Sequence, residues 1–217
     1  MIIKKRNIRN AVLKMLKINM GLKSERKMSV LTNVSILQKC QSKSLEDLSD
    51  MLRRLLAEIV YEIAKEKGFN SKFFAYSSVN RHSVYPEKDV EEKMKRANVI
   101  IAITTYSLTH TNARVEACKA GARVASMPTF TPEMFYPNEP MNVNYVKMAK
   151  ETEKLAKLLS KTKVEICTVT SSKLNFSLDG REEKADTGLF TYSGSWKGLS
   201  AGEAYVTSIG GPAIEKL

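Results

Sequence analysis

The feature that most constrains the fold of this chain is a short, almost unbroken apolar run over residues 98–103, Asn-Val-Ile-Ile-Ala-Ile. A strand with one face in water alternates apolar and polar residues, whereas a strand of a parallel sheet is buried on both faces and reads as continuous apolar sequence. A second such run, Arg123 to Met127, ends at Pro128. The two runs predict central strands of a sheet that is covered on both sides.

Helical patterns separate the predicted strands. The clearest one begins at Ser44, where Ser44 and Asp47 form a capping-box pattern, and ends before Gly68, a typical position for a helix end. Its apolar residues repeat at helical spacing: Leu45, Leu48, Leu52, Leu55, Ile59 and Ile63. Further helices are expected over residues 11–20, 86–96, 112–119 and 145–160, and further strands over 27–32, 73–76, 164–170 and 174–178.

Strand and helix alternate from residue 27 to residue 170, which predicts an α/β fold with a mostly parallel sheet and helices on both faces. After residue 170 the helical patterns stop and short strands alternate with Gly-containing turns. We therefore expect an α/β domain over residues 1–170, followed by a β-rich segment over residues 171–217.

The net charge of +12 is concentrated in part at the start of the chain, where the basic residues up to Lys27 are opposed only by Glu25. A basic helix can contact nucleic acid or an acidic membrane, or belong to a mitochondrial-type presequence. Lys and Ile dominate here, however, and no nucleic-acid-binding motif accompanies them. We expect a solvated helix face, with no nucleic-acid and no membrane partner.

Two further observations bear on location. No apolar run approaches the roughly 20 residues that span a bilayer. Cys40, Cys118 and Cys167 are odd in number and form no CxxC pair, which predicts a reducing, cytoplasmic compartment.

The loop over residues 104–111 is dense in hydroxyl groups and holds His110, one of two histidines. In a parallel sheet such a loop can bind an anion at the following helix N-terminus, or its Thr and Asn residues can simply cap that helix. His82 and His110 share no motif, and Cys118 within a helix is expected to be a buried structural thiol. No GxSxG, GxGxxG, P-loop or HExxH motif occurs.

Glu203 lies in a frame of small residues that includes Gly198 and Gly202. Glycine lets a backbone approach a ligand closely, and hard cations prefer carboxylate oxygen, so Glu203 is a candidate metal ligand. A solvated Glu after a turn has the same appearance. Tyr205, two residues later, is expected to pack against its surroundings.

Several segments together resemble the leucyl aminopeptidases of the thermophilic metalloprotease type, which include aminopeptidases T and S. The matching residues span roughly 8–208 and are Ala97–Ala102 with Ser107–Arg114, Glu116–Ala117 with Gly121–Pro128, Leu174–Arg181 with Asp186–Gly188, and Gly198–Tyr205. Gly198 and Ser200 stand where the family has Asn and Pro.

The resemblance implies a metal-dependent exopeptidase that releases N-terminal residues from peptides. Two divalent ions per complete site, zinc, cobalt or magnesium, would polarise the scissile carbonyl and generate hydroxide. Glu203 matches the first metal ligand of the family, the other ligands belong to a later region without counterpart here, and His110 matches a motif that binds no metal. A related branch comprises metal-dependent ring-cleaving dioxygenases of hydroxypyridines, which also need further His and Asp ligands.

The expected function is therefore the N-terminal part of a metallo-aminopeptidase that is not competent alone. Its peptide site would be completed within a homodimer or by a separate C-terminal half, with Glu203 as one metal ligand and the catalytic residues unassigned. The alternative is a non-catalytic remnant that acts as a binding or dimerisation module. A third reading, a basic nucleic-acid-associated protein, predicts an affinity that falls steeply with salt.

Overall fold

The computed structural model describes residues 4–23, 27–34, 45–77, 88–160, 163–170, 172–178 and 180–206. Contacts divide the chain into two compact units. Unit 1 comprises Met1–Val143 and Gly188–Ser200, and unit 2 comprises Asn144–Thr187 and Ala201–Leu217. These units do not coincide with the expected segments 1–170 and 171–217, because the helix and hairpin before residue 178 group with the last strands of the chain.

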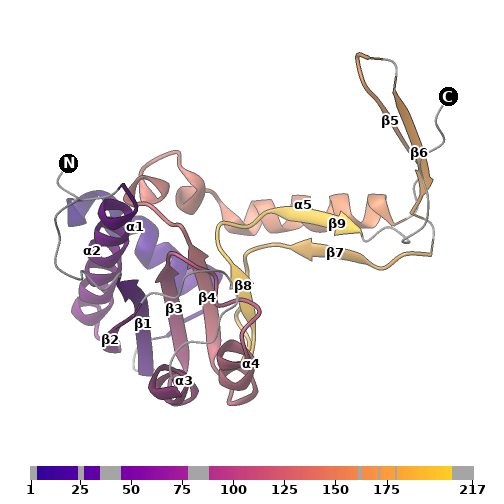
Figure 1. Ribbon diagram of the computed structural model, residues 1–217. Helices are drawn as coiled ribbons and strands as arrows, with labels where there is room; N and C mark the ends of the chain where they lie inside the picture. Colours follow the sequence, from indigo (N-terminus) through magenta and orange to yellow (C-terminus); the bar gives the residue numbers. More distant parts are fainter. Residues whose placement is uncertain are drawn as a thin grey trace. The chain divides into compact units, whose positions relative to one another are not determined.

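Unit 1 is built on a five-stranded parallel sheet in the order β2-β1-β3-β4-β8 (Figure 1). Its strands are β1 (Lys27–Val34), β2 (Asn70–Ser77), β3 (Val99–Thr104), β4 (Arg123–Pro128) and β8 (Trp196–Gly198). The α/β class, with a mostly parallel sheet and a strand-rich C-terminal part, is therefore confirmed.

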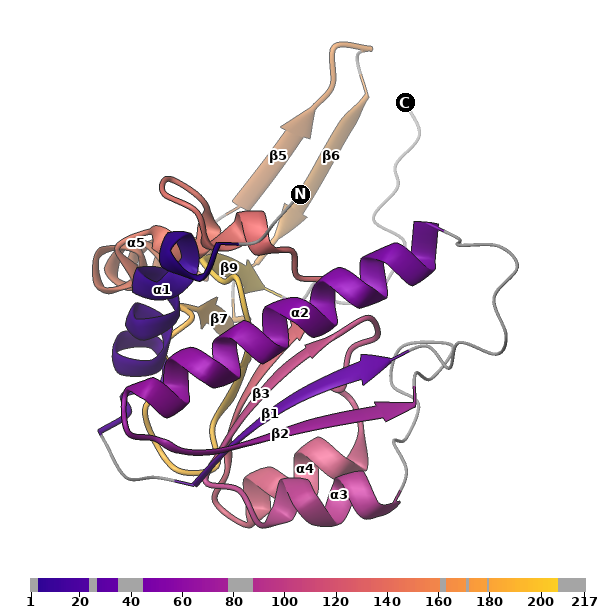
Figure 2. The same cartoon turned by 90° about the vertical axis from the view of Figure 1, so that its left-hand side faces the viewer.

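Helices cover both faces of this sheet. They are α1 (Lys5–Lys14), continued by the π-helical turn η1 (Met15–Asn19), α2 (Leu45–Glu66), α3 (Lys88–Lys95) and α4 (Asn112–Lys119), with the short 3-10 helices η2 (Pro132–Phe135) and η3 (Pro140–Asn142). Figure 2 shows α2 on one face of the sheet and α3 and α4 on the other.

The two-sided cover explains the apolar run from which the strand was predicted. Val99, Ile101 and Ile103 of β3 pack in one core together with residues of α1 and α2. Ile100 and Ala102 point the opposite way, into the core formed with α3 and α4. Because successive side chains of a strand alternate between faces, both sets must be apolar when both faces are covered.

The long helix α2 is present, but its buried stripe differs from the expected one. Leu52 and Leu55 are 38 % and 40 % exposed, so this part of the predicted apolar stripe is wrong. The buried stripe consists of Leu56, Ala57, Ile59, Val60, Ile63 and Ala64, and Asp50 and Arg53 continue it toward the helix start. The expected capping residue Ser44 and the expected helix start at Pro86 lie outside the described residues.

The segment at 188–195 returns to the N-terminal helices of unit 1. Asn19 is fully buried, donates from Nδ2 to the Gly188 carbonyl at 2.9 Å and accepts from the Phe190 amide at 2.8 Å. Arg123 is also buried and donates from Nη1 to the carbonyls of Met20 and Gly21. These bonds satisfy polar groups that the core would otherwise leave without partners.

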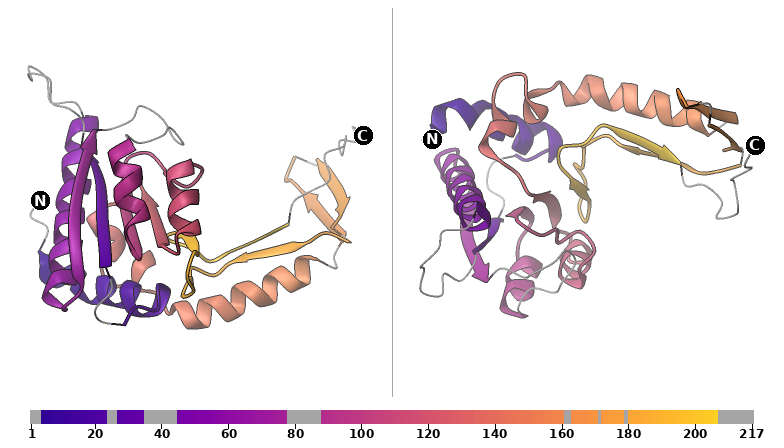
Figure 3. Two further views of the ribbon diagram at one scale, coloured as in Figure 1. Left: turned by 90° about the horizontal axis from the view of Figure 1, so that it is seen from below. Right: turned by 45° about the horizontal axis from the view of Figure 1, so that its top comes forward.

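The described residues of unit 2 form one helix and two antiparallel pairs of strands. The helix α5 (Tyr145–Leu159) runs along the ribbon formed by β7 (Glu183–Asp186) and β9 (Glu203–Val206), as Figure 3 shows. β5 (Lys163–Cys167) and β6 (Lys173–Ser177) form a hairpin. The strand expected at 164–170 does not join the parallel sheet, so this prediction is wrong. Among the described strands, β5 pairs with β6 alone, and β8 is the fifth parallel strand.

No helix in the described ranges is long and apolar enough to cross a membrane.

Candidate functional site

Glu203 is the first residue of β9, and its side chain is exposed. The antiparallel register of the ribbon places Glu203 opposite Asp186 of β7. Directly opposed residues of such a ladder point to the same face, with Cβ atoms about 4.5–5.5 Å apart. The ribbon thus carries two carboxylates on one face, an arrangement that a bound cation would stabilise.

Gly202 has a packing role in this ribbon. Its φ is +128°, and a Cβ atom at this position would lie 2.7 Å from Sδ of Met148 on α5. The Gly202 amide donates to the Asp186 carbonyl at 2.8 Å, which fixes the start of β9. The small residue before Glu203 is therefore explained by close contact with a helix, without a ligand.

Tyr145 lies at the start of α5, beside the same strands. It is 4 % exposed, and burial raises the pKa of its hydroxyl. A hydrogen bond with the Ala201 backbone lowers this pKa, and the charge of Asp186 raises it further. In the part of the chain that the structure describes, no three His, Cys, Asp or Glu side chains gather in a way that could hold a metal ion.

The hydroxyl groups of the loop after β3 form hydrogen bonds within unit 1. Thr111 caps α4: its Oγ1 accepts from the Arg114 amide at 3.3 Å and donates to the Leu108 carbonyl at 2.8 Å. Thr109 hydrogen-bonds Ser107 at 2.8 Å and Ser126 at 3.0 Å. The capping interpretation of this loop is therefore confirmed for Thr111, and the Thr109 hydroxyl bonds side chains of the loop and of β4.

The remaining predicted residues belong to different parts of the chain. His110 is exposed in unit 1, whereas Glu203 and the exposed Tyr205 belong to unit 2, and His82 and Cys40 lie outside the described residues. Cys118 is half-buried, and burial raises the pKa of its thiol although the nearby Arg114 partly offsets the rise. Cys118 is therefore less buried than expected, and its raised pKa gives the thiol little thiolate character.

Sequence reasoning missed a buried charged cluster in unit 1. Arg53 donates from Nη2 to Oδ1 of Asp50 at 2.6 Å and from Nε to Oγ1 of Thr105 at 3.0 Å, and Thr105 in turn donates to the same carboxylate. The side chains of Arg53 and Asp50 are only 10 % and 8 % exposed. The cluster could have been predicted from helical spacing, because residues 50, 53, 57, 60 and 64 share one face of α2.

This cluster lies at the carboxyl edge of the parallel sheet, because Thr105 directly follows the last residue of β3. β1 and β3 are neighbours in the order β2-β1-β3-β4-β8, and the chain leaves them toward opposite edges of the sheet. The cluster therefore lies at the point where the strand order reverses, which is where open α/β sheets bind ligands.

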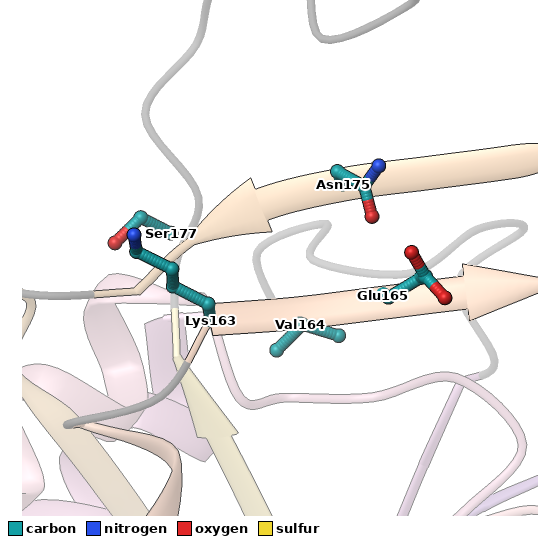
Figure 4. Close-up of a pocket in the computed structure, with 5 residues that line it drawn as sticks. All are labelled: Lys163, Val164, Glu165, Asn175 and Ser177. Carbon is teal, nitrogen blue, oxygen red and sulfur yellow. The ribbon is translucent and has the colours of Figure 1, made fainter.

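A shallow depression of about 520 Å³ lies on the β5–β6 hairpin of unit 2, lined by Lys163, Val164, Glu165, Asn175 and Ser177 (Figure 4). Figure 4 shows these side chains spread along the two strands and not converging on one point. The depression has the character of open hairpin surface.

Comparison with known proteins shows the fold. No family model matches the sequence. No curated protein matches it either. Among solved structures, the chain is similar to 2,5-dihydroxypyridine dioxygenase from Pseudomonas putida KT2440, with a TM-score of 0.58, 11 % identity, and coverage of 94 % of this chain and 56 % of the dioxygenase. The chain thus spans just over half the length of that protein.

The expected membership of the leucyl aminopeptidase family is overturned by these comparisons, since a dioxygenase shares the fold and no aminopeptidase family is matched. The matching motifs misled because of their positions in the fold. Two of them coincide with β3 and β4, and another contains the cap of α4, so they follow requirements of the α/β sheet. Apolar strands and helix caps recur in any fold of this class and do not identify a peptidase.

Proposed function

We propose that this protein is a non-catalytic assembly module that associates with a second copy of itself through unit 2. The observation that carries the proposal is the apolar surface of this small unit. Large apolar side chains are exposed on α5, on the hairpin and on β9: Val146, Leu155, Leu158, Ile166, Val169 and Tyr205. Apolar surface of this kind is typical of protein interaction sites.

The hairpin supports the proposal. Val164 and Ile166 of β5 alternate with Lys163, Glu165 and Cys167, so the pairing with β6 gives the hairpin one apolar and one polar face. Ile166 is 47 % exposed. An isolated two-stranded hairpin is marginally stable in water, and cover over its apolar face would stabilise it.

Charge favours unit 2 as the contact surface between two copies. Unit 2 contains ten of the 35 basic residues and nine of the 23 acidic residues, so it carries +1 of the net charge of +12, and unit 1 carries +11. Two copies that met through unit 1 would bring large like charges together. An interface between near-neutral surfaces avoids that repulsion.

Sedimentation velocity over about 1–100 μM protein tests the association. We expect a concentration-dependent dimer that Leu155→Ser with Ile166→Ser weakens by roughly tenfold or more, because both side chains are exposed and apolar. The matched control, Lys154→Ser with Lys163→Ser, changes exposed polar neighbours and should leave the dimer intact. A monomer throughout, or equal weakening by both double variants, would refute the proposal.

A second candidate function is a divalent-cation half-site that another polypeptide completes, as expected for a partial metalloenzyme. The opposed carboxylates of Asp186 and Glu203 favour it. A catalytic zinc ion needs about three protein ligands, so these two would have to be joined by others. The identity of the metal stays a prediction. Turnover of peptides, or of a dihydroxypyridine like that named for the structural neighbour, stays a prediction as well.

Calorimetric titration of the chain with zinc or cobalt tests this candidate. We expect weak binding, with a Kd on the order of 0.1–1 mM, that Glu203→Gln and Asp186→Asn each abolish. The control Glu182→Gln removes an exposed carboxylate of the same unit outside the β7–β9 ladder. With either metal, the unmodified chain is expected to hydrolyse leucine p-nitroanilide no faster than the Glu203→Gln variant does. Metal binding unchanged in that variant would contradict the assignment of Glu203.

A further inference from the structure

The parallel sheet of unit 1 ends in a long edge strand. β2 is the last strand of the order β2-β1-β3-β4-β8, and Figure 1 shows it at the left-hand end of the sheet. Its eight residues all pair in register with β1, and among the described strands β1 is its only neighbour. Every second residue of such a strand directs its N–H and C=O groups away from the sheet, where another extended chain can pair with them.

The first part of this edge is accessible. Asn70, Lys72 and Ala75 are exposed, and Phe73 and Phe74 are partly buried. Because the backbone is extended and its side chains leave room beside it, residues 70–75 offer both main-chain groups and apolar surface for contact.

An aromatic ring and a lysine border the edge on each face of the sheet. On the face that α2 covers, the rings of Phe73 and Tyr61 have centroids 6.0 Å apart, and Nζ of Lys65 lies 5.9 Å from the centroid of the Tyr61 ring. On the opposite face, Nζ of Lys93 on α3 lies 5.0 Å from the centroid of the Phe74 ring. A strand that pairs with β2 would therefore meet apolar and cationic groups on both of its faces.

The charges around the start of β2 are mainly positive. Lys65, Lys67 and Lys72 are exposed, and none of them forms an ion pair with a carboxylate of the described chain. Two acidic residues of the adjoining helices already have partners: Glu66 pairs with α1, and Asp89 pairs within α3. The surplus of positive charge favours an acidic partner and opposes pairing with the same edge of a second copy.

We propose that an extended acidic segment of a partner protein adds to this sheet as a strand beside β2. Its backbone pairs with the outward-facing groups of residues 70–75. Its carboxylates lie beside Lys65 and Lys72, and its apolar side chains pack against Phe73 and Phe74. In strand addition the main-chain hydrogen bonds supply affinity and the flanking side chains supply specificity. This contact lies in unit 1 and goes beyond the proposed association through unit 2.

Lys72 also has a simpler explanation. Lysine on an edge strand discourages edge-to-edge aggregation, and this role needs no partner. The simpler explanation predicts that an acidic peptide has no affinity for the edge, whereas the proposal predicts saturable binding that depends on both charge and backbone pairing.

Fluorescence anisotropy measures the binding of a labelled, end-capped peptide, Thr-Val-Glu-Glu-Val-Thr-Val, to the full chain. We expect a Kd on the order of 100 μM at low salt, and weaker binding at about 0.3 M salt because exposed charges are then screened. A peptide with Lys-Lys in place of Glu-Glu tests the charge, and a peptide N-methylated at alternate amides tests the backbone pairing. Each should bind roughly tenfold more weakly or worse.

Two double variants locate the charge effect. Lys65→Glu with Lys72→Glu should weaken binding of the acidic peptide by roughly tenfold or more, because both lysines border the edge. The matched control, Lys4→Glu with Lys17→Glu, changes the net charge of unit 1 by the same amount at two residues of the N-terminal helical segment and should keep most of the affinity. All four lysines are exposed, so both variants should fold.

Hydrogen exchange identifies the strand that the peptide covers. With saturating peptide, amides of β2 should exchange more slowly, whereas those of β8 at the other end of the sheet should not change. Absence of binding, equal affinity for the Glu and Lys peptides, equal weakening by the two double variants, or no added protection of β2 would overturn the proposal. Protection of β2 that rises with protein concentration alone would identify a second copy as the occupant and would overturn it as well.

Discussion

At the scale of single residues, the surroundings of a side chain decide its role. Gly202 and Gly198 look alike in sequence, and both flank the predicted metal ligand Glu203. Gly202 has φ +128° and faces Met148 at a distance that excludes a Cβ atom, whereas a Cβ atom on Gly198 would meet nothing within 4 Å. Of the two, only Gly202 is required to be glycine, because its φ of +128° disfavours any side chain and a Cβ atom would also meet Met148.

Gly202→Ala is therefore expected to destabilise the protein by about 1–3 kcal/mol, because it adds a contact below 3 Å and a strained backbone conformation. Gly198→Ala is the matched control and should change the free energy of unfolding by less than about 0.5 kcal/mol. The free energies are measured by urea denaturation. Adding Met148→Ala to Gly202→Ala should recover only the steric part of the loss. Equal stability of the two Gly→Ala variants would contradict this account.

At the scale of elements, the basic helix α1 forms solvent-facing ion pairs with another helix. Lys5 pairs with Glu62 at 2.8 Å and also with Glu66, and Arg9 pairs with Glu66. All of these pairs join α1 to α2, two helices that lie far apart in sequence. The expected solvated basic face therefore also has a structural role: part of the charge of α1 joins two helices of unit 1.

The pairing makes the α1–α2 contact sensitive to pH. Hydrogen bonds from Lys5 and Arg9 lower the pKa of Glu66 below its ordinary value of 4.5. A lowered carboxyl pKa contributes stability that is present above the unfolded value and is lost as pH falls through the folded value. Hydrogen bonds from Glu62 and Glu66 raise the pKa of Lys5 above 10.5, so its contribution is present below that value and is lost at higher pH.

We expect Glu66→Gln to lower the urea midpoint at neutral pH and to match the unmodified chain once the pH falls below the folded pKa of Glu66. The effect should be small, since these pairs face solvent. Glu58→Gln, which removes a carboxylate paired within α2, is the control. Measuring the midpoints over about pH 3–8 checks this expectation. Parallel curves for Glu66→Gln and the unmodified chain over the whole range would contradict it.

At the scale of the whole molecule, two units of different character share one chain. Unit 1 has two apolar cores, one on each face of its sheet, and most of the positive charge. Unit 2 is near neutral and stacks one helix on a narrow ribbon, with a separate hairpin. Elements with few buried apolar contacts open at lower free energy than core strands. The two units should therefore differ in local stability.

Hydrogen exchange followed by mass spectrometry measures that difference. Amides of β5 and β6 should exchange on the order of 100-fold faster than those of β3 and β4, because the hairpin is two-stranded and its side chains are largely exposed. At protein concentrations where the proposed dimer forms, protection of the hairpin should rise. Equal protection of the hairpin and the central strands in dilute protein would show that the hairpin has its own stabilising cover.

Local sequence patterns were enough to predict the fold class, the two central strands and the helices between them. The spacing and type of the apolar residues predict which strand faces are buried: Ile100 and Ile101 are both apolar because both faces of the sheet are covered. In the same way, Thr111 predicts the start of the helix that follows it, which it caps. The charged face of α2 and the packing role of Gly202 were decided by tertiary structure. Arg53 meets Thr105 across 52 positions of sequence, and Gly202 meets Met148 across the ribbon. Such contacts depend on how the elements pack against one another, so the local spacing of residues does not predict which residue will be the partner.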